Sequence, residues 1–351
     1  MSCWPSRPLS AILFSVVAFA LASCGSTTHP LASGSTGNPG AQTVAAGPLL
    51  GAWWDPQAGG LRLLYGVPGA ASEGPAIDND GTYSGALACV RGKIAILTTS
   101  AGGLSLGALP QGLPASVTSE TISKPQIVFS PSCTAALALS SDGSGGILLQ
   151  GLLSRPTSSR VSFAEPAGAA AVADDGSILT ASQRADGTAA VQFLAAGNSS
   201  PRIVTTLSRL GALAFLPGAP SAMLADAGTN TVVEAGNLTG NLNLVPVAGP
   251  SDGVAQPFAI RASADGHWAV IANQASGTLV RIDLSGQSAA ARTLCRCSPS
   301  MLDPLAGNLV FRVNAPGTGT VWAYDGNGSA PRLAFLPVDG ALGTKPHGAL
   351  R

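Results

Sequence analysis

Residues 260–286 read IRASADGHWAVIANQASGTLVRIDLSG, and this stretch decides the fold. Apolar and polar residues alternate in strand-like fashion over Trp268–Asn273 and again over Thr278–Leu284. The pair Asp265-Gly266 precedes the first segment, and Gly277 separates the two. Asp-Gly pairs and single glycines at such positions favour tight turns. The stretch therefore predicts a short antiparallel meander, in which each strand pairs with the next.

A turn like the one at Gly277 recurs along the chain between two strand-like segments. Seven such positions follow one another at offsets of 43, 43, 42, 43, 47 and 42 residues. They are Gly59, Gly102, Gly145, Gly187, Asn230, Gly277 and Gly319. Glycine and asparagine are the residues that best tolerate the positive φ of a tight turn. Seven units of about 43 residues therefore fill residues 50 to about 340.

A unit of this length, with four short strands and no helix, is typical of a β-propeller blade. A lone four-stranded sheet leaves both faces exposed, whereas seven sheets around an axis cover one another. We therefore predict an all-β fold, a seven-bladed β-propeller of four-stranded antiparallel blades, over residues 47–345, with a tail at 346–351. The first unit begins near Leu49 with the second strand of a blade. Its innermost strand must come from Ala41–Ala46 or from Val338–Thr344; we favour the carboxyl end, because propellers often join both termini in one blade.

The unit at residues 260–286 resembles the repeats of the YVTN-type propeller family. The resemblance lies in Ser263–Gly266, Val270–Asn273 and Ile282–Asp283, and the other six units keep it in part. Members of that family are mostly binding or uncharacterised proteins. The resemblance therefore implies the fold and leaves the ligand open.

The first residues of the chain have the features of an export signal. Arg7 lies in a short polar leader, and Leu9–Leu21 is an almost uninterrupted apolar run, too short for a comfortable membrane span. The run ends in Leu21-Ala-Ser-Cys24, which resembles the lipobox of bacterial lipoproteins, whose cysteine is acylated and becomes the first residue after cleavage. We predict a signal peptide at 1–23 and lipidation of Cys24. The alternative is an ordinary cleaved signal in which Cys24 has no role.

Residues 24–46 are rich in Ser, Thr, Gly and Pro and carry no Asp, Glu, Lys or Arg. Such a segment cannot bury enough apolar area to offset its ordering entropy, so we expect a flexible tether. Gly25, rather than Asp, follows the predicted lipidated cysteine. In Gram-negative lipoproteins this pattern usually implies sorting to the outer membrane. The predicted location is therefore the cell envelope, on the periplasmic face of the outer membrane if the source is Gram-negative.

The charge balance argues against a nucleic-acid partner. The chain has 18 Lys and Arg against 18 Asp and Glu, and only 10% of its residues are charged. Phosphate backbones are bound mainly by clustered Lys and Arg, so a neutral chain does not fit them. The apolar content of 46% is also too high for a disordered protein.

Four cysteines follow the predicted anchor: Cys89, Cys133, Cys295 and Cys297. An exported chain is oxidised, so disulfides are the leading interpretation. Cys89 lies 13 residues before its turn glycine and Cys133 lies 12 before its own, so both occupy similar places in adjacent blades. A bridge between them is geometrically reasonable. Cys295 and Cys297 would then pair locally, although such a short bridge is strained; the alternatives are free thiols or a soft-metal site.

The sequence offers no clear catalytic or metal-binding constellation, and we predict no cofactor and no metal. None of the three histidines has a partner at ligand spacing. Asp78–Thr82 resembles the start of a calcium loop but lacks the closing carboxylate, so a polar turn is the simpler interpretation. Gly103–Gly107 matches the letters of a nucleophile elbow, but its Ser105 falls on a strand.

The leading hypothesis is a non-enzymatic, membrane-anchored propeller that binds an envelope protein or a small ligand on one face. Propeller ligands generally meet loops at one end of the central channel. The more variable segments between blades are Val67–Thr82, Gln111–Lys124 and Ala248–Pro257. Trp53 and Trp54 are adjacent on a strand, so one lies on each face: at least one belongs to the core, and the other is a candidate ligand contact.

Two other functions fit the same fold. The first is an enzyme resembling the propeller lactonases or quinoprotein dehydrogenases, for which the inner strands offer little beyond Arg261, Asp174 and Glu165. The second is a structural subunit of an envelope complex, whose mark would be a stable protein partner without a small ligand.

Overall fold

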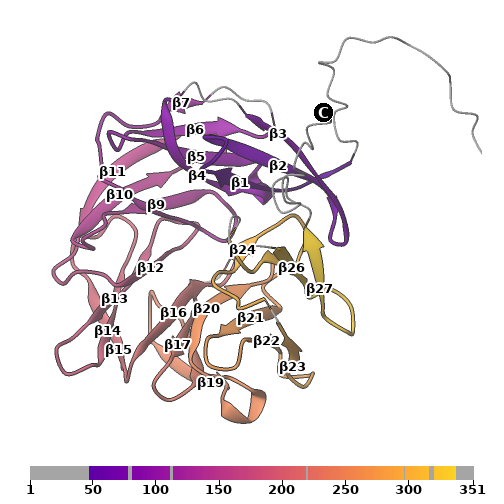
Figure 1. Cartoon of the computed structure of the whole chain (residues 1–351). Helices are drawn as coiled ribbons and strands as arrows, with labels where there is room; N and C mark the ends of the chain where they lie inside the picture. Colours follow the sequence, from indigo (N-terminus) through magenta and orange to yellow (C-terminus); the bar gives the residue numbers. More distant parts are fainter. Residues whose placement is uncertain are drawn as a thin grey trace, which may run out of the picture. The chain divides into compact units, whose positions relative to one another are not determined.

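The computed structural model describes residues 47–77, 81–110, 114–218, 220–295, 297–315 and 320–336, all within one compact unit, Thr43–Arg351. Over these ranges the chain forms seven antiparallel sheets, which follow one another in a ring (Figure 1). The fold is the predicted all-β, seven-bladed propeller. The predicted signal peptide, Cys24, the tether and the tail lie outside the described residues.

Each blade is a meander in which successive strands pair as neighbours. Blade 1 contains β1 (Leu49–Asp55), β2 (Gly60–Val67) and β3 (Ala70–Ile77). Blade 2 contains β4 (Tyr83–Cys89), β5 (Ile94–Thr99), β6 (Leu104–Ala108) and β7 (Ala115–Ser116). Blade 3 contains β8 (Gln126–Phe129), β9 (Ala135–Leu139), β10 (Gly145–Gln150) and β11 (Thr157–Ser162). Blade 4 contains β12 (Ala169–Val172), β13 (Ile178–Gln183), β14 (Ala189–Leu194) and β15 (Arg202–Leu207).

The remaining blades keep the same plan. Blade 5 contains β16 (Leu210–Phe215), β17 (Ala222–Asp226), β18 (Thr231–Gly236) and β19 (Asn243–Ala248). Blade 6 contains β20 (Pro257–Ala262), β21 (Trp268–Asn273), β22 (Thr278–Asp283) and β23 (Ala291–Leu294). Blade 7 contains β24 (Asp303–Pro304), β25 (Val310–Arg312), β26 (Val321–Asp325) and β27 (Arg332–Leu336). Two short 3-10 turns, η1 (Val90–Gly92) and η2 (Pro250–Asp252), are the helical segments of the described ranges, and neither is long and apolar enough to cross a membrane.

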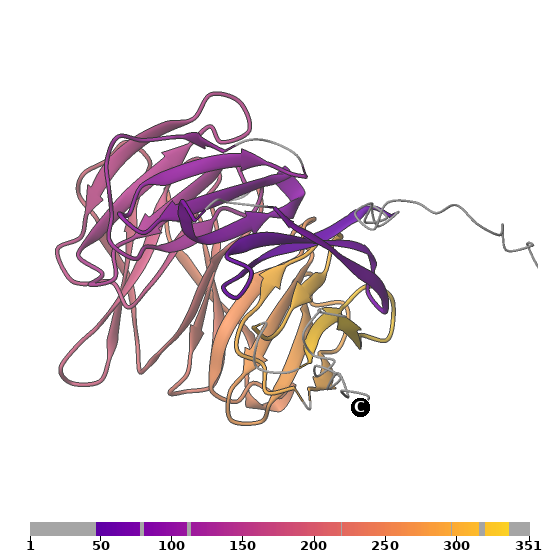
Figure 2. The ribbon, with the colours of Figure 1, turned by 45° about the horizontal axis from the view of Figure 1, so that its top comes forward.

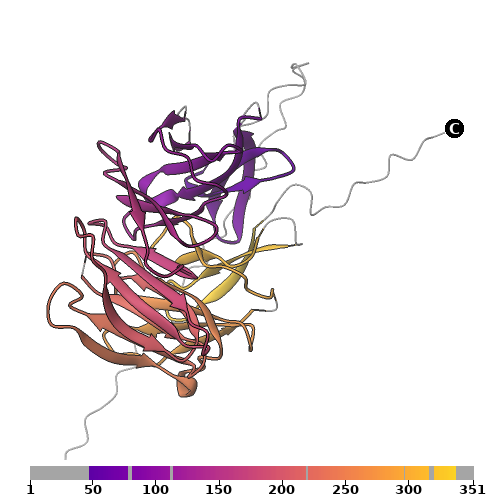
Figure 3. The same ribbon diagram turned by 90° about the vertical axis from the view of Figure 1, so that its left-hand side faces the viewer.

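The core of the described chain is divided among the seven spaces between neighbouring blades. One cluster of buried apolar side chains fills each space, so the central strands of a blade are covered on both faces. All five residues of β9, Ala-Ala-Leu-Ala-Leu, are buried for this reason. Small alanines let the sheets approach closely, while the leucines fill the space between them. Figure 3 shows successive sheets standing face to face in this way.

The ring closes between the first and last blades. Leu50, Trp53 and Leu64 of blade 1 pack against Val321 and Leu336 of blade 7 in one buried cluster. Figures 1 and 2 show blade 1, in indigo, beside blade 7, in yellow. Closure therefore rests on side-chain packing between segments at opposite ends of the described chain.

A backbone hydrogen bond that repeats between blades strengthens this closure. The Ala264 amide of blade 6 donates to the Asn308 carbonyl of blade 7 at 2.9 Å. The Ala306 amide, 42 residues after Ala264, donates to the Leu50 carbonyl of blade 1 at 2.7 Å. The contact between blades 7 and 1 therefore contains the same backbone hydrogen bond as the contact between blades 6 and 7.

Blade 1 has three strands within the described residues. The turn at Gly59 lies between β1 and β2, where the other blades have the turn between their second and third strands. The innermost strand of this blade, predicted from Ala41–Ala46 or Val338–Thr344, lies outside the described ranges. Which terminus supplies it stays a prediction.

The predicted turn residues have a left-handed backbone in five of the blades. Their φ angles are +60° at Gly59, +86° at Gly102, +88° at Gly187, +58° at Asn230 and +60° at Gly277. Gly319 lies outside the described residues.

Blade 3 departs from the predicted turn position by two residues. Gly143 takes the left-handed conformation, with φ +71°, and Gly145 is the first residue of β10. The Asp142 carboxylate accepts a hydrogen bond from the Ser144 amide at 3.0 Å, which fixes the turn at the Asp142-Gly143 pair. A Cβ atom at position 143 would lie 2.4 Å from the Ala167 carbonyl oxygen, so glycine is needed here for space as well as for φ. The prediction of Gly145 was wrong because three nearby glycines compete for one turn.

The segments expected to vary between blades also contain regular structure. Val67–Thr82 includes β3, the outermost strand of blade 1; Gln111–Lys124 includes β7, and Ala248–Pro257 includes η2. The β3 sequence, Ala-Ala-Ser-Glu-Gly-Pro-Ala-Ile, looks like a loop because it contains both Gly and Pro. An outermost strand tolerates proline, since one of its edges needs no ladder hydrogen bond.

Candidate functional site

A cavity of about 90 Å³ lies on the ring axis, at the end where the first and second strands of each blade are joined. We call this end the hairpin end. Residues from the innermost strands and first hairpins of blades 2 to 7 line the cavity. Its position makes it the natural meeting point of all these blades.

Equivalent residues of successive innermost strands face the cavity. In blades 3 to 7, a backbone N–H just after the first strand donates a hydrogen bond across the turn to a carbonyl at or next to the start of the second strand. The residue that faces the cavity lies two positions before this N–H donor in each of these blades. These residues are Val128, Ala171, Ala214, Arg261 and Asp303, and all five line the cavity. A small or branched apolar side chain occupies the position in three blades, whereas the two adjacent blades 6 and 7 place an arginine and an aspartate there.

Arg261 extends from β20 and is half-buried. Its Nε donates a hydrogen bond to the Leu302 carbonyl oxygen of blade 7 at 3.2 Å. Burial lowers the pKa of the Arg261 guanidinium, and the Asp303 carboxylate opposes this shift. An arginine remains protonated through such a shift, so a full positive charge lies in the cavity. Among the described residues, no protein oxygen accepts a hydrogen bond from its two terminal nitrogens.

Asp303 is engaged by a second arginine. Nη2 of Arg312, on β25, donates to Oδ2 of Asp303, and the Arg312 side chain is buried. The Arg312 guanidinium carbon lies 5.8 Å from the centroid of the Trp53 ring of blade 1, within the range of a cation–π contact. Nη1 of Arg312 is buried and has no hydrogen-bond partner in the described part of the chain. Asp303 is therefore neutralised, and the pair leaves one donor unused.

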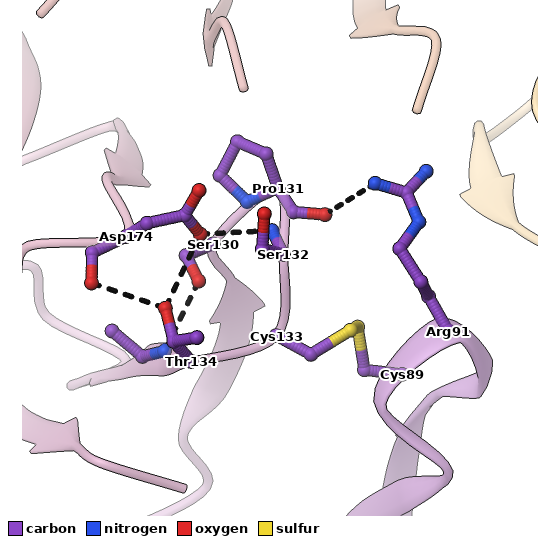
Figure 4. Close-up of a disulfide and its surroundings, with 9 residues drawn as sticks. Cys89, Arg91, Ser130, Pro131, Ser132, Cys133, Thr134 and Asp174 are labelled. Carbon is purple, nitrogen blue, oxygen red and sulfur yellow. Dashed lines mark hydrogen bonds between the residues drawn. A yellow bond between two sulfur atoms is a disulfide. The ribbon is translucent and has the colours of Figure 1, made fainter. Parts of the chain in front are cut away.

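Arg91, in η1 of blade 2, also lines the cavity. Figure 4 shows its side chain beside the hairpin of blade 3. Its Nη1 donates to the Pro131 carbonyl oxygen of blade 3 at 2.9 Å. The carboxylates of Asp174 and Asp265 are close enough to stabilise its charge. Arg91 thus reaches from one blade over the hairpin of the next.

A disulfide and a carboxylate fix the hairpins around Arg91. Cys89 and Cys133 are joined across blades 2 and 3, with 6.0 Å between their Cα atoms (Figure 4). Oδ1 of Asp174 in blade 4 accepts hydrogen bonds from the Ser132 amide at 2.8 Å and the Thr134 hydroxyl at 3.3 Å. Three neighbouring blades are therefore tied together at the hairpin end.

The four cysteines form the two pairs that the sequence favoured. Besides Cys89 with Cys133, Cys295 is joined to Cys297 just after β23, with 5.0 Å between their Cα atoms. Neither pair supplies a free thiol for catalysis or for a soft metal.

A second cavity, of about 280 Å³, lies between blades 4 and 5 at the hairpin end. Phe215 borders both this cavity and the one on the axis. Its two acidic side chains are Asp174, whose hydrogen bonds are described above, and Asp175, which accepts from the Ser177 amide at 2.8 Å and hydroxyl at 3.1 Å. These carboxylates already have donors, whereas the axial cavity holds unused donors, so the axial cavity is the better candidate site.

Most of the residues that the sequence singled out lie away from the axial cavity. Of the three proposed for an enzyme, only Arg261 lines it; Asp174 holds a hairpin, and the backbone carbonyl of Glu165 accepts from the Ser182 hydroxyl. Ser105 is buried on β6 opposite Ser116.

The remaining candidates fit structural roles or lie outside the described ranges. Trp53 is buried between blades 7 and 1, and Trp54 is half-buried. The side chain of His267 is exposed in its turn. Asp78–Asp80, the possible calcium ligands, are not among the described residues. Within the described part of the chain, no three His, Cys, Asp or Glu side chains gather around a point that could hold a metal.

Asp303, Arg312 and Arg91 were not among the residues predicted for the site. The signal for Asp303 was present, because it lies 42 residues after Arg261, one repeat further on. Arg312 carried no such signal, since its partner in the adjacent strand could be named only once the register of β24 and β25 was known. Arg91 sits in a hairpin with a 3-10 turn, which departs from the Ser263–Gly266 hairpin of blade 6 on which the repeat was recognised.

Comparison with known proteins shows similarity at the level of the fold. No protein-family model matches the sequence, and no curated protein matches it. A functionally unknown protein from Desulfotomaculum acetoxidans DSM 771 superposes with a TM-score of 0.53 and 13% identity, over 82% of this chain and 100% of that one. Virginiamycin B lyase from Staphylococcus aureus gives a TM-score of 0.51 and 10% identity, over 70% and 81%. The periplasmic gluconolactonase PpgL of Pseudomonas aeruginosa gives 0.46 and 15%, over 66% and 77%.

Proposed function

We propose that this protein is an exported, lipid-anchored β-propeller that binds a ligand at the hairpin end of its channel without transforming it. The observation that carries the proposal is the axial cavity with the charged side chain of Arg261 inside it. Ligand sites are concave, mostly apolar, and contain a few well-placed polar groups. The cavity has this composition, because its lining is mostly apolar and includes the charged side chains of Arg91, Arg261 and Asp303.

The hydrogen-bond donors of Arg261 that stay unused within the described ranges support a ligand at this position. Removing a charged group from water is costly unless a partner accepts its hydrogen bonds. The terminal nitrogens of Arg261 have no acceptor among the described residues, although three equivalent positions of the ring hold Val or Ala. Arg261 is half-buried, so its terminal nitrogens stay open to the cavity and can donate to a bound acceptor.

The rigidity of the hairpin end also suits binding. The Cys89–Cys133 disulfide and the hydrogen bonds of Asp174 hold the hairpins of blades 2, 3 and 4 in place. A site that is already ordered loses less conformational entropy when its ligand arrives.

Export and anchoring rest on the sequence. The lipobox-like Leu21–Cys24 ends an apolar run, and an uncharged tether follows it. Two disulfide pairs are in keeping with an oxidising compartment. The partner at the hairpin end is then a small envelope molecule or the surface of an envelope protein.

Two variants test the anchor and the binding end separately. Cys24→Ala is expected to move the protein from the membrane fraction to the soluble fraction, and continued membrane retention would contradict lipidation. For the binding end, a photo-crosslinking amino acid replaces His267, an exposed residue of a first hairpin. The matched control replaces Ala185, which is exposed in the turn between β13 and β14 at the opposite end of its blade. Crosslinks from position 267 and none from 185 support the proposal; equal crosslinking from both positions refutes it.

A further inference from the structure

We infer that the axial cavity binds a small organic anion with one carboxylate group, held by the guanidinium of Arg261. The inference rests on the proposed binding function and names the class of its ligand. Arg261 presents two terminal nitrogens in a planar fork, and a carboxylate matches that fork with two parallel hydrogen bonds.

The charges around the cavity favour an anion. Arg312 pairs with Asp303, so the negative charge inside the cavity is already neutralised. Arg261 and Arg91 then leave the lining with a positive excess.

The carboxylates of Asp174 and Asp265 stabilise the charge of Arg91 from outside the cavity lining, so the uncompensated positive charge inside the cavity is that of Arg261. Asp174 is not part of the lining and accepts hydrogen bonds from blade 3. Asp265 is also outside the lining: Ser263 and the Asn308 amide group donate to its two oxygens, with Asn308 at 2.7 Å from Oδ2. Both carboxylates lie at the rim and are held by neighbouring blades.

The size and the other wall of the cavity limit the ligand. A volume of about 90 Å³ takes several water molecules, and therefore only a ligand with few non-hydrogen atoms. The lining from blades 2, 3 and 4 is largely apolar and includes Leu87, Ala88, Val128 and Ala171. These side chains suit a short aliphatic body, whose burial contributes about 0.8 kcal/mol for each methylene group. A short-chain monocarboxylate meets both conditions.

The competing explanation is that Arg261 only ties two blades together through Nε. Arg292 offers a comparison, because its Nε donates to the Asp252 carbonyl oxygen at 3.0 Å and its Nη2 to the Ser251 carbonyl oxygen, both about one repeat away in sequence. Arg292 lies outside the axial cavity. A purely structural role would therefore make the two arginines behave alike towards a carboxylate.

Thermal unfolding of the mature propeller with butyrate as probe decides between these explanations. At constant ionic strength, butyrate at ten times its Kd is expected to raise the Tm of the wild type by about 2 °C, while butylamine leaves it unchanged. Arg261→Met is expected to abolish the shift and Arg292→Met to retain it. Arg261→Lys, which keeps the charge but not the fork, is expected to retain a smaller shift and provides a second variant if Arg261→Met does not fold.

Three outcomes would overturn the inference: no butyrate shift in the wild type, an undiminished shift in Arg261→Met, or an equal shift with inorganic phosphate. Failure of the binding function itself would look different. In that case no small molecule of any charge shifts the Tm of the wild type and position 267 captures no protein, whereas a wrong ligand class leaves a Tm shift with a small molecule other than a carboxylate.

Discussion

Removing the Cys89–Cys133 disulfide should lower the stability of the whole ring. The bridge joins the first hairpins of blades 2 and 3, and 44 residues separate its two cysteines. Both cysteines are buried in the cluster between these blades. The perturbation is the double substitution Cys89→Ala and Cys133→Ala, which removes the cross-link without adding a buried hydroxyl.

The expected loss follows from the length of chain that the bridge closes. In the chain-entropy model a loop of this size stabilises the folded state by about 4 kcal/mol. The propeller has roughly 290 residues, which gives an unfolding entropy near 0.6 kcal/mol per kelvin. The double variant should therefore melt about 7 °C below the wild type.

Melting curves of the oxidised proteins test this value, with mass spectrometry to show that the wild-type bridge is formed. The matched control is Cys295→Ala with Cys297→Ala, whose bridge spans a sequence separation of only 2 and is expected to contribute about 1 kcal/mol. A Cys89–Cys133 variant that melts within about 1 °C of the wild type, or a larger loss in the control, would refute the argument from loop length.

Three further predictions concern a carboxylate, a turn and the carboxyl end. Asp226 is buried and, although burial alone raises its pKa, hydrogen bonds from the Ser208 side chain and from backbone amides lower the pKa overall. Asp226→Asn should therefore lower the free energy of unfolding by about 2 kcal/mol near neutral pH, and this difference from the wild type should become smaller as the pH falls below about 4. A difference that does not depend on pH in denaturant titrations would contradict this. Gly143→Ala should destabilise the protein by at least twice the roughly 1 kcal/mol expected for Gly187→Ala, because both glycines have positive φ but only position 143 has a backbone atom in the way; equal Tm values would exclude the clash. Deleting residues 337–351 should lower the Tm sharply if this segment supplies the missing strand of blade 1, and an unchanged Tm would exclude closure from the carboxyl end.

The repeat could be predicted from the sequence because its signal is local. A strand, a turn and a second strand occupy some 20 neighbouring residues, and each needs only the right pattern and a residue that tolerates positive φ. The predicted strand Trp268–Asn273 coincides with β21, and Thr278–Leu284 differs from β22 by one residue. Errors arose where several residues satisfied the same local rule, as at Gly143 and Gly145.

The candidate site was harder to predict because it is assembled from different blades. Arg261 could be placed near the channel from its position in the repeat, but its neighbourhood depends on Asp303 and Arg312, which come from the next blade. Whether an arginine is paired or unused depends on side-chain contacts across blades, and these follow from packing rather than from spacing along one unit. The outermost strand β3 was hidden for a related reason, since its Gly and Pro are acceptable only at an edge.

The contact between two neighbouring blades is called a seam here, and the seam between blades 7 and 1 has a consequence for the order of folding. At the other six seams the blades that meet are consecutive, about one repeat apart, whereas the hydrogen bond from Ala306 to Leu50 joins residues separated by 256 positions. Closing a sixfold longer loop costs about 1.6 kcal/mol more entropy, before any contact at the seam forms. The six consecutive seams can therefore assemble first, as an open arc, and the ring closes last. Opening the native ring at this seam would then break no contact between blades that are consecutive in sequence.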